Sequence, residues 1–262
     1  MKAIMLAAGL GLRLERGPGH PPKVMLRFGG TTLLERHIAI LRRLPIDQLV
    51  IVTGYRAEAI CDGIARAEAE DFVQTIYNPD YTSGSVLSLW TAREQLLTGD
   101  DIVFMDADVL YDARLMRRLL ESDKRNCFLL DRDTEPGDEP VKICVRDGTI
   151  VDFRKLPEIE HDYWGEWPGF VKLAPDMAEK VVAAAQAYVD AGRVEEMYEE
   201  AFRDVVLAEP PATFAFEDVT GLPWIEIDFL ADLARARDTV LPRLRPDAED
   251  DAEDGEEEGA VA

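Results

Sequence analysis

The sequence predicts an α/β fold in which helices cover both faces of a mixed, mostly parallel sheet. Short apolar runs alternate with segments of helical periodicity through the first half of the chain, an order typical of parallel strands joined by crossover helices. The second half adds strands, helices and one hairpin signal, so part of the sheet is expected to be antiparallel. With 262 residues, 47% of them hydrophobic, the chain can form one large core or a core with a small lobe.

The first half begins with an apolar run at residues 2–6, which we predict to be a strand, and continues into a glycine-rich turn at 7–11. Thr32 and Glu35 form a capping pattern at the start of a helix expected over 32–43. The other strands of this half are expected at 48–53, 72–77 and 101–105. The other helices are expected at 57–69, 85–97 and 114–121.

The second half contains a clear hairpin signal, because Arg146-Asp147-Gly148 separates two strand-like segments, 141–145 and 149–153. Pro175 stands in the first turn of a long predicted helix, where proline is favoured, and Pro242 ends the last helix. Further strands are expected at 166–173, 213–217 and 224–227. Helices are expected at 175–191, 194–206 and 230–241.

The chain is strongly acidic, with 29 Lys and Arg against 52 Asp and Glu and a formal net charge of −23. This charge opposes binding to nucleic acid and to anionic lipid surfaces. Nine acids fall within residues 247–258, and we expect a disordered acidic tail at 246–262 after a single domain at 1–245. No apolar stretch approaches the about 20 residues of a membrane span, and the three cysteines form no CxxC pair, so a soluble cytoplasmic protein is expected.

The glycine-rich turn is a candidate nucleotide site. Its small residues let backbone N–H groups approach a ligand closely, and Arg13 and Lys23 add two positive charges that suit a triphosphate. It is not a Walker A loop, and Leu14 stands where a dinucleotide fingerprint has its third glycine. The segment that follows the first strand consists of Leu6, Ala7, Ala8, Gly9, Leu10 and Gly11.

Two acidic patterns lie on or after predicted strands. Asp106-Ala107-Asp108 follows the 101–105 strand, at the edge where open α/β sheets place ligands, and carboxylate oxygens there suit Mg²⁺. Alone, this pattern is equally typical of a solvated turn. Glu226 and Asp228 alternate along a later strand, so their side chains face the same side. Two acids on one face of an apolar strand are poor core residues and indicate a functional site.

The loop, Arg13 and Lys23 are accompanied by further segments that share one family pattern: Val52-Thr53-Gly54-Tyr55, Asn78-Pro79-Asp80-Tyr81, Ser88-Leu89-Trp90, Asp106-Ala107-Asp108, Val141-Lys142 and Trp224-Ile225-Glu226-Ile227-Asp228. Up to about Leu244 the chain resembles the nucleoside-triphosphate transferases, and within them the choline-phosphate cytidylyltransferase branch. That branch also acts on other phospho-alcohols and on aminoethylphosphonate. The resemblance implies a Rossmann-like three-layer nucleotidyltransferase fold. It further implies a nucleotide half at about 1–125 and an acceptor half at about 126–245 with a small hairpin and helical lobe.

The resemblance also implies a Mg²⁺-dependent transfer of CMP from CTP to a phospho- or phosphono-alcohol, with release of pyrophosphate. Choline phosphate, ethanolamine phosphate, aminoethylphosphonate and inositol phosphate are acceptors of this type. Arg13 and Lys23 are the implied catalytic residues, and Asp108, Glu226 and Asp228 the implied Mg²⁺ ligands. The implied nucleotide-binding residues are Leu6, Ala7, Ala8, Gly9, Leu10, Gly11, Ser83, Gly84, Ser88 and Asp106. The implied acceptor-binding residues are Lys142, Lys155, Glu166, Tyr198 and Glu199.

Three alternatives stay open from the residues themselves: a sugar-1-phosphate nucleotidylyltransferase that uses another NTP, a glycosyltransferase that uses a DxD motif, and a non-catalytic nucleotide-binding module. The choice of CTP depends on the branch resemblance, and the sequence indicates no oligomeric state. The carboxylate of Glu199 beside Tyr198 favours a primary ammonium or hydroxyl groups over trimethylammonium. The scattered histidines do not support a hydrolase triad, and His37, on the apolar stripe of the first helix, is expected to be a core or edge histidine.

Overall fold

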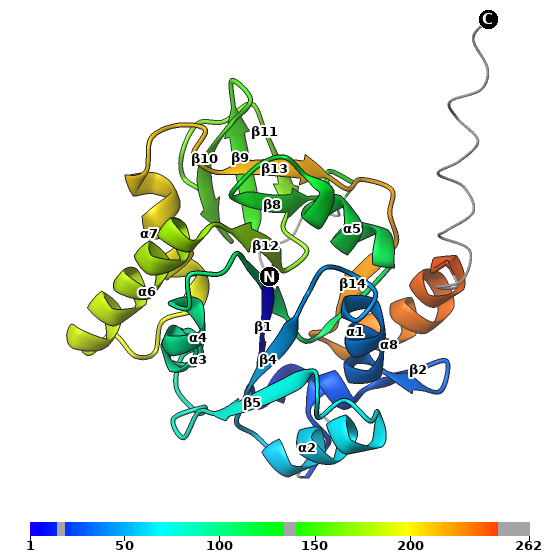
Figure 1. Cartoon of the computed structure of the whole chain (residues 1–262). Coiled ribbons are helices and arrows are strands. Elements are labelled where there is room, and N and C mark those ends of the chain that lie inside the picture. Colours follow the sequence, from blue (N-terminus) through cyan, green and yellow to red (C-terminus); the bar gives the residue numbers. More distant parts are fainter. Residues whose placement is uncertain (15–18, 134–139, 246–262) are drawn as a thin grey trace, which may run out of the picture.

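A computed structural model describes residues 1–14, 19–133 and 140–245 of the chain (Figure 1). In this described part, seven strands form the main sheet, in the order β13-β8-β12-β6-β1-β4-β5. Those strands are β1 (Lys2–Ala7), β4 (Gln48–Thr53), β5 (Val73–Tyr77), β6 (Ile102–Asp106), β8 (Cys127–Leu130), β12 (Phe170–Leu173) and β13 (Ala215–Asp218). β12 runs antiparallel to both of its neighbours, and the other pairs are parallel. The predicted mixed, mostly parallel sheet is therefore confirmed.

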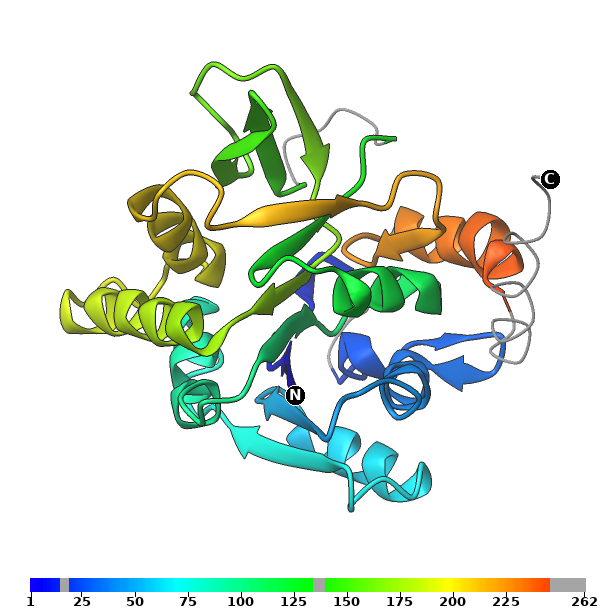
Figure 2. The same ribbon diagram turned by 45° about the horizontal axis from the view of Figure 1, so that its top comes forward.

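Helices cover both faces of this sheet, which gives the predicted three layers (Figures 1 and 2). Side chains alternate along β1, so that Met5 packs into the core of one face and Ile4 into the core of the other. The helices on the Met5 face are α1 (Leu33–Leu41), α2 (Ala57–Arg66), α5 (Ala113–Glu121) and α8 (Leu230–Arg235). Those on the Ile4 face are α3 (Val86–Thr91), α4 (Arg93–Leu96), α6 (Pro175–Asp190) and α7 (Tyr198–Ala208).

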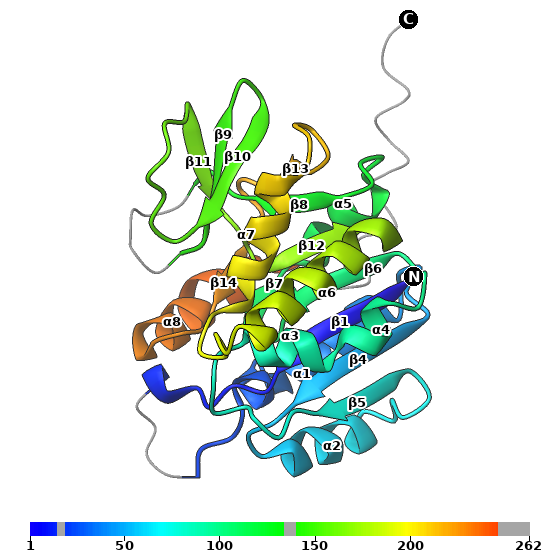
Figure 3. The same ribbon diagram turned by 90° about the vertical axis from the view of Figure 1, so that its left-hand side faces the viewer.

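Smaller sheets complete the fold. The predicted hairpin is present as β9 (Lys142–Arg146) and β10 (Thr149–Arg154), and β11 (Tyr163–Glu166) joins it in the order β10-β9-β11. This sheet stands at the top of Figure 3, with α7 packed against β10. Two shorter pairs join β7 (Val109–Tyr111) to β14 (Trp224–Glu226) and β2 (Arg27–Phe28) to β3 (Thr31–Thr32). No helix among the described residues is both long enough and apolar enough to span a membrane.

Three predicted elements differ from the structure. The single strand expected at 166–173 is wrong: Pro168 lacks an N–H and Gly169 has a φ of +87°, and the chain divides there between β11 and β12, which belong to different sheets. The helix expected at 194–206 starts late, at Tyr198, because the segment before it hydrogen-bonds to the turn around Gly84. The helix expected at 85–97 is divided at Ala92 into α3 and α4.

Asp112 fastens β7 and β14 to the rest of the molecule. Its backbone N–H donates to the carbonyl oxygen of Pro223 at 3.0 Å, beside β14. Its buried carboxylate caps α5 by accepting from the Arg114 backbone at 3.1 Å, and it also accepts from the Arg114 guanidinium and from the Arg245 backbone N–H. Burial alone would raise the pKa of Asp112, but these donors outweigh it and lower the pKa. One carboxylate therefore joins the end of β7, the start of α5 and residue 245.

We expect Asp112→Ala to lower the free energy of unfolding by about 2 kcal/mol at pH 7, because it removes a helix cap and the ion pair between the buried Asp112 carboxylate and Arg114. The lowered pKa means that this stabilisation exists above the ordinary carboxyl pKa and is lost as the pH falls through the folded pKa. Urea denaturation at pH 7 and pH 3 measures both effects. The exposed Asp71→Ala is the matched control and should change stability by less than about 0.5 kcal/mol. An equal loss for Asp112→Ala at both pH values would contradict the role of the ionised carboxylate.

Candidate active site

A cleft of about 390 Å³ opens at the carboxyl ends of β1 and β6. All of the predicted site residues line it except Lys142 and Glu166. The predicted residues that it brings together are Leu6, Ala7, Ala8, Gly9, Leu10, Gly11, Arg13, Lys23, Ser83, Gly84, Ser88, Asp106, Asp108, Lys155, Tyr198, Glu199, Glu226 and Asp228. Segments from both ends of the sequence thus meet in one cleft, as the strand-end position of ligands in open α/β sheets requires.

The glycine loop forms one wall of the cleft and is shaped by close backbone contacts. Gly11 has a φ of +62°, and a Cβ there would lie 3.2 Å from the Lys23 side chain, so this position favours glycine. The carbonyl oxygen of Ala8 accepts from the Tyr55 N–H at 3.0 Å. A Cβ on Gly54 would lie 2.9 Å from that same oxygen. The loop therefore runs close to its neighbours, and Gly9, with nothing near its missing Cβ, leaves open space beside the backbone.

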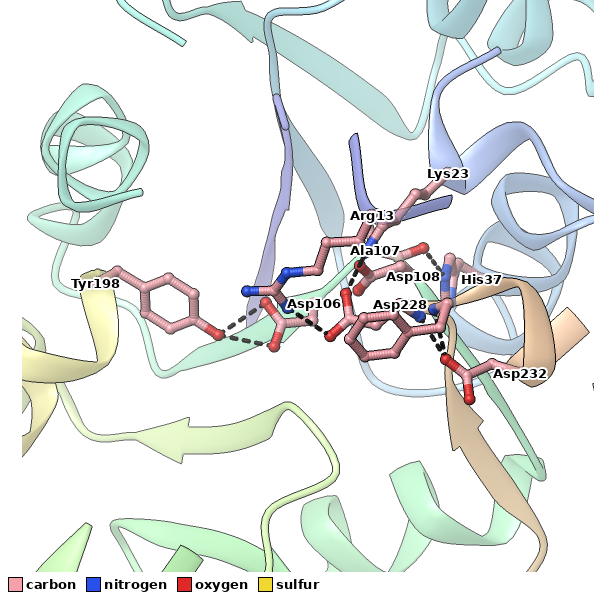
Figure 4. A network of polar contacts seen from close by, with 10 residues as sticks. Arg13, Lys23, His37, Asp106, Ala107, Asp108, Tyr198, Asp228 and Asp232 are labelled. Carbon is pink, nitrogen blue, oxygen red and sulfur yellow. Dashed lines mark hydrogen bonds and ion pairs between the residues drawn. The ribbon is translucent and has the colours of Figure 1, made fainter. Parts of the chain in front are cut away.

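Lys23 lies at the centre of the charged network (Figure 4). Its Nζ donates to Asp108 Oδ2 at 2.7 Å and to Asp228 Oδ1 at 2.6 Å. Burial alone would lower the pKa of Lys23, but the two carboxylates outweigh burial and raise it, so the ammonium stays charged. The more exposed Arg13 donates to Asp228 Oδ2 at 2.9 Å. Both cations proposed from the sequence therefore contact the acidic cluster.

Asp108, Glu226 and Asp228 form a cluster that matches the ligand preference of a hard divalent cation. One carboxylate oxygen from each lies within 4.8 Å of the others. Pairing of β7 with β14, and a 3.0 Å hydrogen bond from the Ile227 N–H to the Asp108 carbonyl oxygen, place these distant segments together. Burial, and then the charges of Asp108 and Asp228, raise the pKa of Glu226 well above its usual value. A divalent cation would relieve this repulsion, so the donor set fits Mg²⁺.

Asp106, Tyr198 and Glu199 line a further part of the cleft, where Asp106 ends β6 beside Leu6 of β1. The Tyr198 hydroxyl lies 2.8 and 2.7 Å from the two carboxylate oxygens of Asp106 (Figure 4). Burial, followed by the charges of Asp108 and Glu199, raises the pKa of Asp106. Burial likewise raises the pKa of Glu199 to about 7, and its Oε2 is buried without a hydrogen-bond partner in the described structure. Such an oxygen is a ready acceptor for an N–H or O–H group of a ligand.

Lys142 and Glu166 lie outside the lining of this cleft. Lys142 is buried, and its Nζ donates to the carbonyl oxygen of Lys155 at 2.7 Å and lies 5.4 Å from the centre of the Trp164 ring. Glu166 lines a second cavity of about 260 Å³ together with Asp131, which contributes with burial to raise the Glu166 pKa to about 7. The two cavities share Glu226 and Asp228, so Glu166 and the glycine loop line different cavities that meet at this pair.

Sequence reasoning missed two residues that support the site. Asp232 Oδ2 accepts from the backbone N–H groups of Asp228 and Phe229, at 2.9 and 2.7 Å. The sequence does indicate the role of Asp232, because an acid in the first turn of the last predicted helix is typical of a capping residue. His37 was interpreted as a core residue and is indeed buried, but its Nε2 lies 3.0 Å from the Ala107 carbonyl oxygen. Nothing local in the sequence indicates that contact.

Comparisons with known proteins indicate the family of this chain. A sequence model of the MobA-like NTP transferase domain matches residues 3–163. The CMP-5'-(3-aminopropyl)phosphonate synthase of Streptomyces rubellomurinus is 24% identical over 90% of this chain, but the match spans only 38% of that relative's length. The CTP:phosphoglutamine cytidylyltransferase of Campylobacter jejuni is 21% identical over 89% of this chain and 98% of its own.

Solved structures support the same fold. The CTP:phosphocholine cytidylyltransferase of Streptococcus pneumoniae superposes with a TM-score of 0.70, at 22% identity, over 89% of this chain and 96% of its own. At that identity the likeness shows the fold, and it confirms the predicted nucleotidyltransferase architecture. The family model covers more than half of the sequence and includes the glycine loop, Lys23 and Asp108. The chain therefore belongs to the family of MobA-like NTP transferase domains.

Proposed function

We propose that this NTP transferase moves CMP from CTP to a small phosphorylated or phosphonate alcohol and releases pyrophosphate. The observation that carries the proposal is the position of Lys23. Its ammonium bridges Asp108 and Asp228 in the same cleft that the glycine loop lines. A loop for phosphates, a fixed cation and a carboxylate cluster for a metal are the parts that phosphoryl-group chemistry needs. The names of two relatives, a CTP:phosphoglutamine cytidylyltransferase and a CMP-5'-(3-aminopropyl)phosphonate synthase, support the choice of substrates.

The nucleotide would occupy the wall contributed by residues 1–125. In this proposal the backbone of residues 6–11 and the turn at 83–88 hold the base and ribose, and Asp106 faces the nucleoside. Arg13, which is exposed at the rim of the cleft, binds the β- and γ-phosphates. The acceptor half, 126–245, contributes Lys155, Tyr198 and Glu199 to the other wall.

The reaction would be an in-line displacement at the α-phosphorus of CTP. An oxygen of the acceptor phosphate attacks, a new P–O–P bridge forms, and the bond to the β-phosphate breaks as pyrophosphate leaves. The acceptor phosphate is largely dianionic at neutral pH, because its second pKa is about 6, so no general base is required. Lys23 stays protonated and neutralises charge on the α-phosphate as the displacement proceeds. Catalysis then consists of positioning and charge neutralisation.

Asp108, Glu226 and Asp228 would hold Mg²⁺. When bound, the ion supplies positive charge that offsets the charge on the phosphate oxygens. The Asp232 carboxylate, which accepts from the backbone at Asp228, would keep the third of these ligands in place.

Replacing a metal ligand should reduce turnover strongly. We expect Asp108→Asn and Asp228→Asn each to lower kcat by about 100-fold or more, the scale of losing one electrostatic stabiliser. Pyrophosphate release measures the effect, and a chelator should abolish activity until Mg²⁺ is restored. The exposed Asp238→Asn is the matched control and should retain full activity. Unchanged turnover in excess chelator would remove the metal from the proposal.

Replacing Lys23 and replacing Arg13 should cause different kinetic defects. Lys23→Ala should lower the rate of the chemical step while CTP binding weakens only modestly, because its charge acts mainly in the transition state. Arg13→Ala should raise the KM for CTP, because triphosphate binding precedes chemistry. Single-turnover kinetics with separate CTP titrations distinguish the two, and melting temperatures control for the ion pairs that Lys23→Ala breaks. Identical kinetic defects would contradict this division of roles.

The acceptor should carry a primary ammonium or hydroxyl groups. Glu199 offers an unpartnered buried oxygen that can accept from N–H or O–H but gains no hydrogen bond from trimethylammonium. We expect kcat/KM for ethanolamine phosphate, aminoethylphosphonate or inositol phosphate to exceed that for choline phosphate about tenfold, the scale of one hydrogen bond to a charged group. With an ammonium acceptor the preference should grow as the pH rises through 7, because Glu199 then ionises.

Two variants sharpen that test. Glu199→Gln keeps the size of the side chain but removes the titration, so the pH dependence of the preference should vanish. Glu199→Trp supplies an aromatic face and should narrow or reverse the preference. A wild-type kcat/KM for choline phosphate above that for the other three acceptors together would overturn this account of the pocket and leave nucleotidyl transfer intact.

A further inference from the structure

His37 is a buried polar residue beside the carboxylate cluster that the proposed reaction does not use. It lies in the middle of α1 and is fully buried. Its Nε2 lies 3.0 Å from the carbonyl oxygen of Ala107, the residue between Asp106 and Asp108 (Figure 4). The sequence places His37 in the apolar stripe of this helix, so its connection to the site is visible only in the fold.

The hydrogen-bonding pattern fixes which nitrogen carries the proton. A carbonyl oxygen can only accept, so Nε2 donates its N–H to Ala107. Burial lowers the pKa of His37 to about 4, and the ring is therefore neutral at neutral pH, with an unprotonated Nδ1. That Nδ1 is buried and has no hydrogen-bond partner among the residues that the structure describes.

An apolar side chain would suit this position better if packing were its only task. The other buried residues of α1 are all aliphatic: Leu33, Leu34, Ile38, Ile40 and Leu41. Histidine adds to this stripe one unpartnered nitrogen, which is unfavourable, and one hydrogen bond, to Ala107. The bond to Ala107 is thus what distinguishes His37 from the leucine or isoleucine found elsewhere on the same face.

The ring is held in the orientation that this bond needs. Tyr111 of β7 stacks on it at 5.5 Å between ring centres, and Phe170 of β12 packs edge-on against Tyr111 at 4.7 Å. The next carbonyl, that of Asp108, accepts from Ile227 of the segment that carries Glu226 and Asp228. The turn that bears Asp108 is therefore fastened from two sides, by α1 and by β14.

We propose that His37 is a positioning residue for the carboxylate cluster: its bond to Ala107 holds the peptide from which Asp108 projects, and so strengthens binding of the divalent cation. The inference rests on the proposed function, since it takes Asp108, Glu226 and Asp228 as the cation ligands. Outer partners that orient metal ligands have a characteristic effect, because their loss typically weakens metal binding by about 10- to 100-fold without removing a ligand.

The test is binding of Mn²⁺ to the full chain, measured by electron paramagnetic resonance without substrate. We expect His37→Leu, which fills the space but cannot donate, to weaken Mn²⁺ binding about tenfold. His37→Gln, whose side-chain amide can donate to Ala107, should recover most of the affinity. Should His37→Leu not fold, the unbranched His37→Met gives the same comparison with His37→Gln.

Ile40→Ala is the matched control, because it creates a cavity in the same helix and leaves the side chain that donates to Ala107 in place. It should lower the melting temperature and leave the Mn²⁺ affinity unchanged. Equal Mn²⁺ affinity in wild type and His37→Leu, or an equal loss in Ile40→Ala, would overturn the positioning role while the proposed function stands. A wild-type chain that binds no Mn²⁺ would overturn both the positioning role and the metal site, and pyrophosphate release in chelator would then decide whether nucleotidyl transfer survives.

Discussion

Repulsion among the carboxylates of the cleft is the interaction that the surrounding structure must offset. Asp108, Glu226 and Asp228 lie close enough to share one cation, and Asp106 and Glu199 add further negative charge to the same cleft. The ammonium of Lys23 offsets part of this charge by bridging two members of the cluster. The strands bring these acids together from distant parts of the chain, because Asp106 ends β6, Glu226 ends β14, and Asp108 and Asp228 follow those strands closely. Pre-formed charge of this kind favours a cationic ligand over further acid.

The local patterns in the sequence were enough for most of the fold. Alternation of apolar runs and helical segments identified β1, β4, β5 and β6, and the Thr32–Glu35 capping box is present at the start of α1. The predicted element boundaries were wrong where contacts between residues distant in the sequence determine where a helix starts or a strand ends. The late start of α7 depends on bonds to the turn at Gly84, and the break before β12 lets Gly169 reach Asp106, whose Oδ2 would lie 2.8 Å from an added Cβ. Neither neighbour is close in sequence.

In the site, too, local sequence patterns predicted some residues, and contacts between distant segments determined the others. Residue type, position at strand ends and the family resemblance together predicted that the glycine loop, Lys23 and the three clustered acids share one site, and all of them line one cleft. Strand position alone could not tell which way Lys142 and Glu166 point, because a shift of one residue in register turns a strand side chain to the opposite face. The contacts of His37 and Tyr198 are equally non-local. His37 joins α1 to the turn after β6 and Tyr198 joins α7 to the last residue of β6, and only the packing of helix on sheet determines these contacts.

Gly84 marks a seam between the two walls of the cleft. A Cβ there would lie 2.2 Å from the Glu196 carbonyl oxygen, and hydrogen bonds join Gly84 to Val194 and Val86 to Glu196. The turn around Gly84 is thus hydrogen-bonded directly to the segment that leads into Tyr198 and Glu199. Both segments line the cleft, so a residue larger than glycine at position 84 would shift the lining of the cleft on both sides at once.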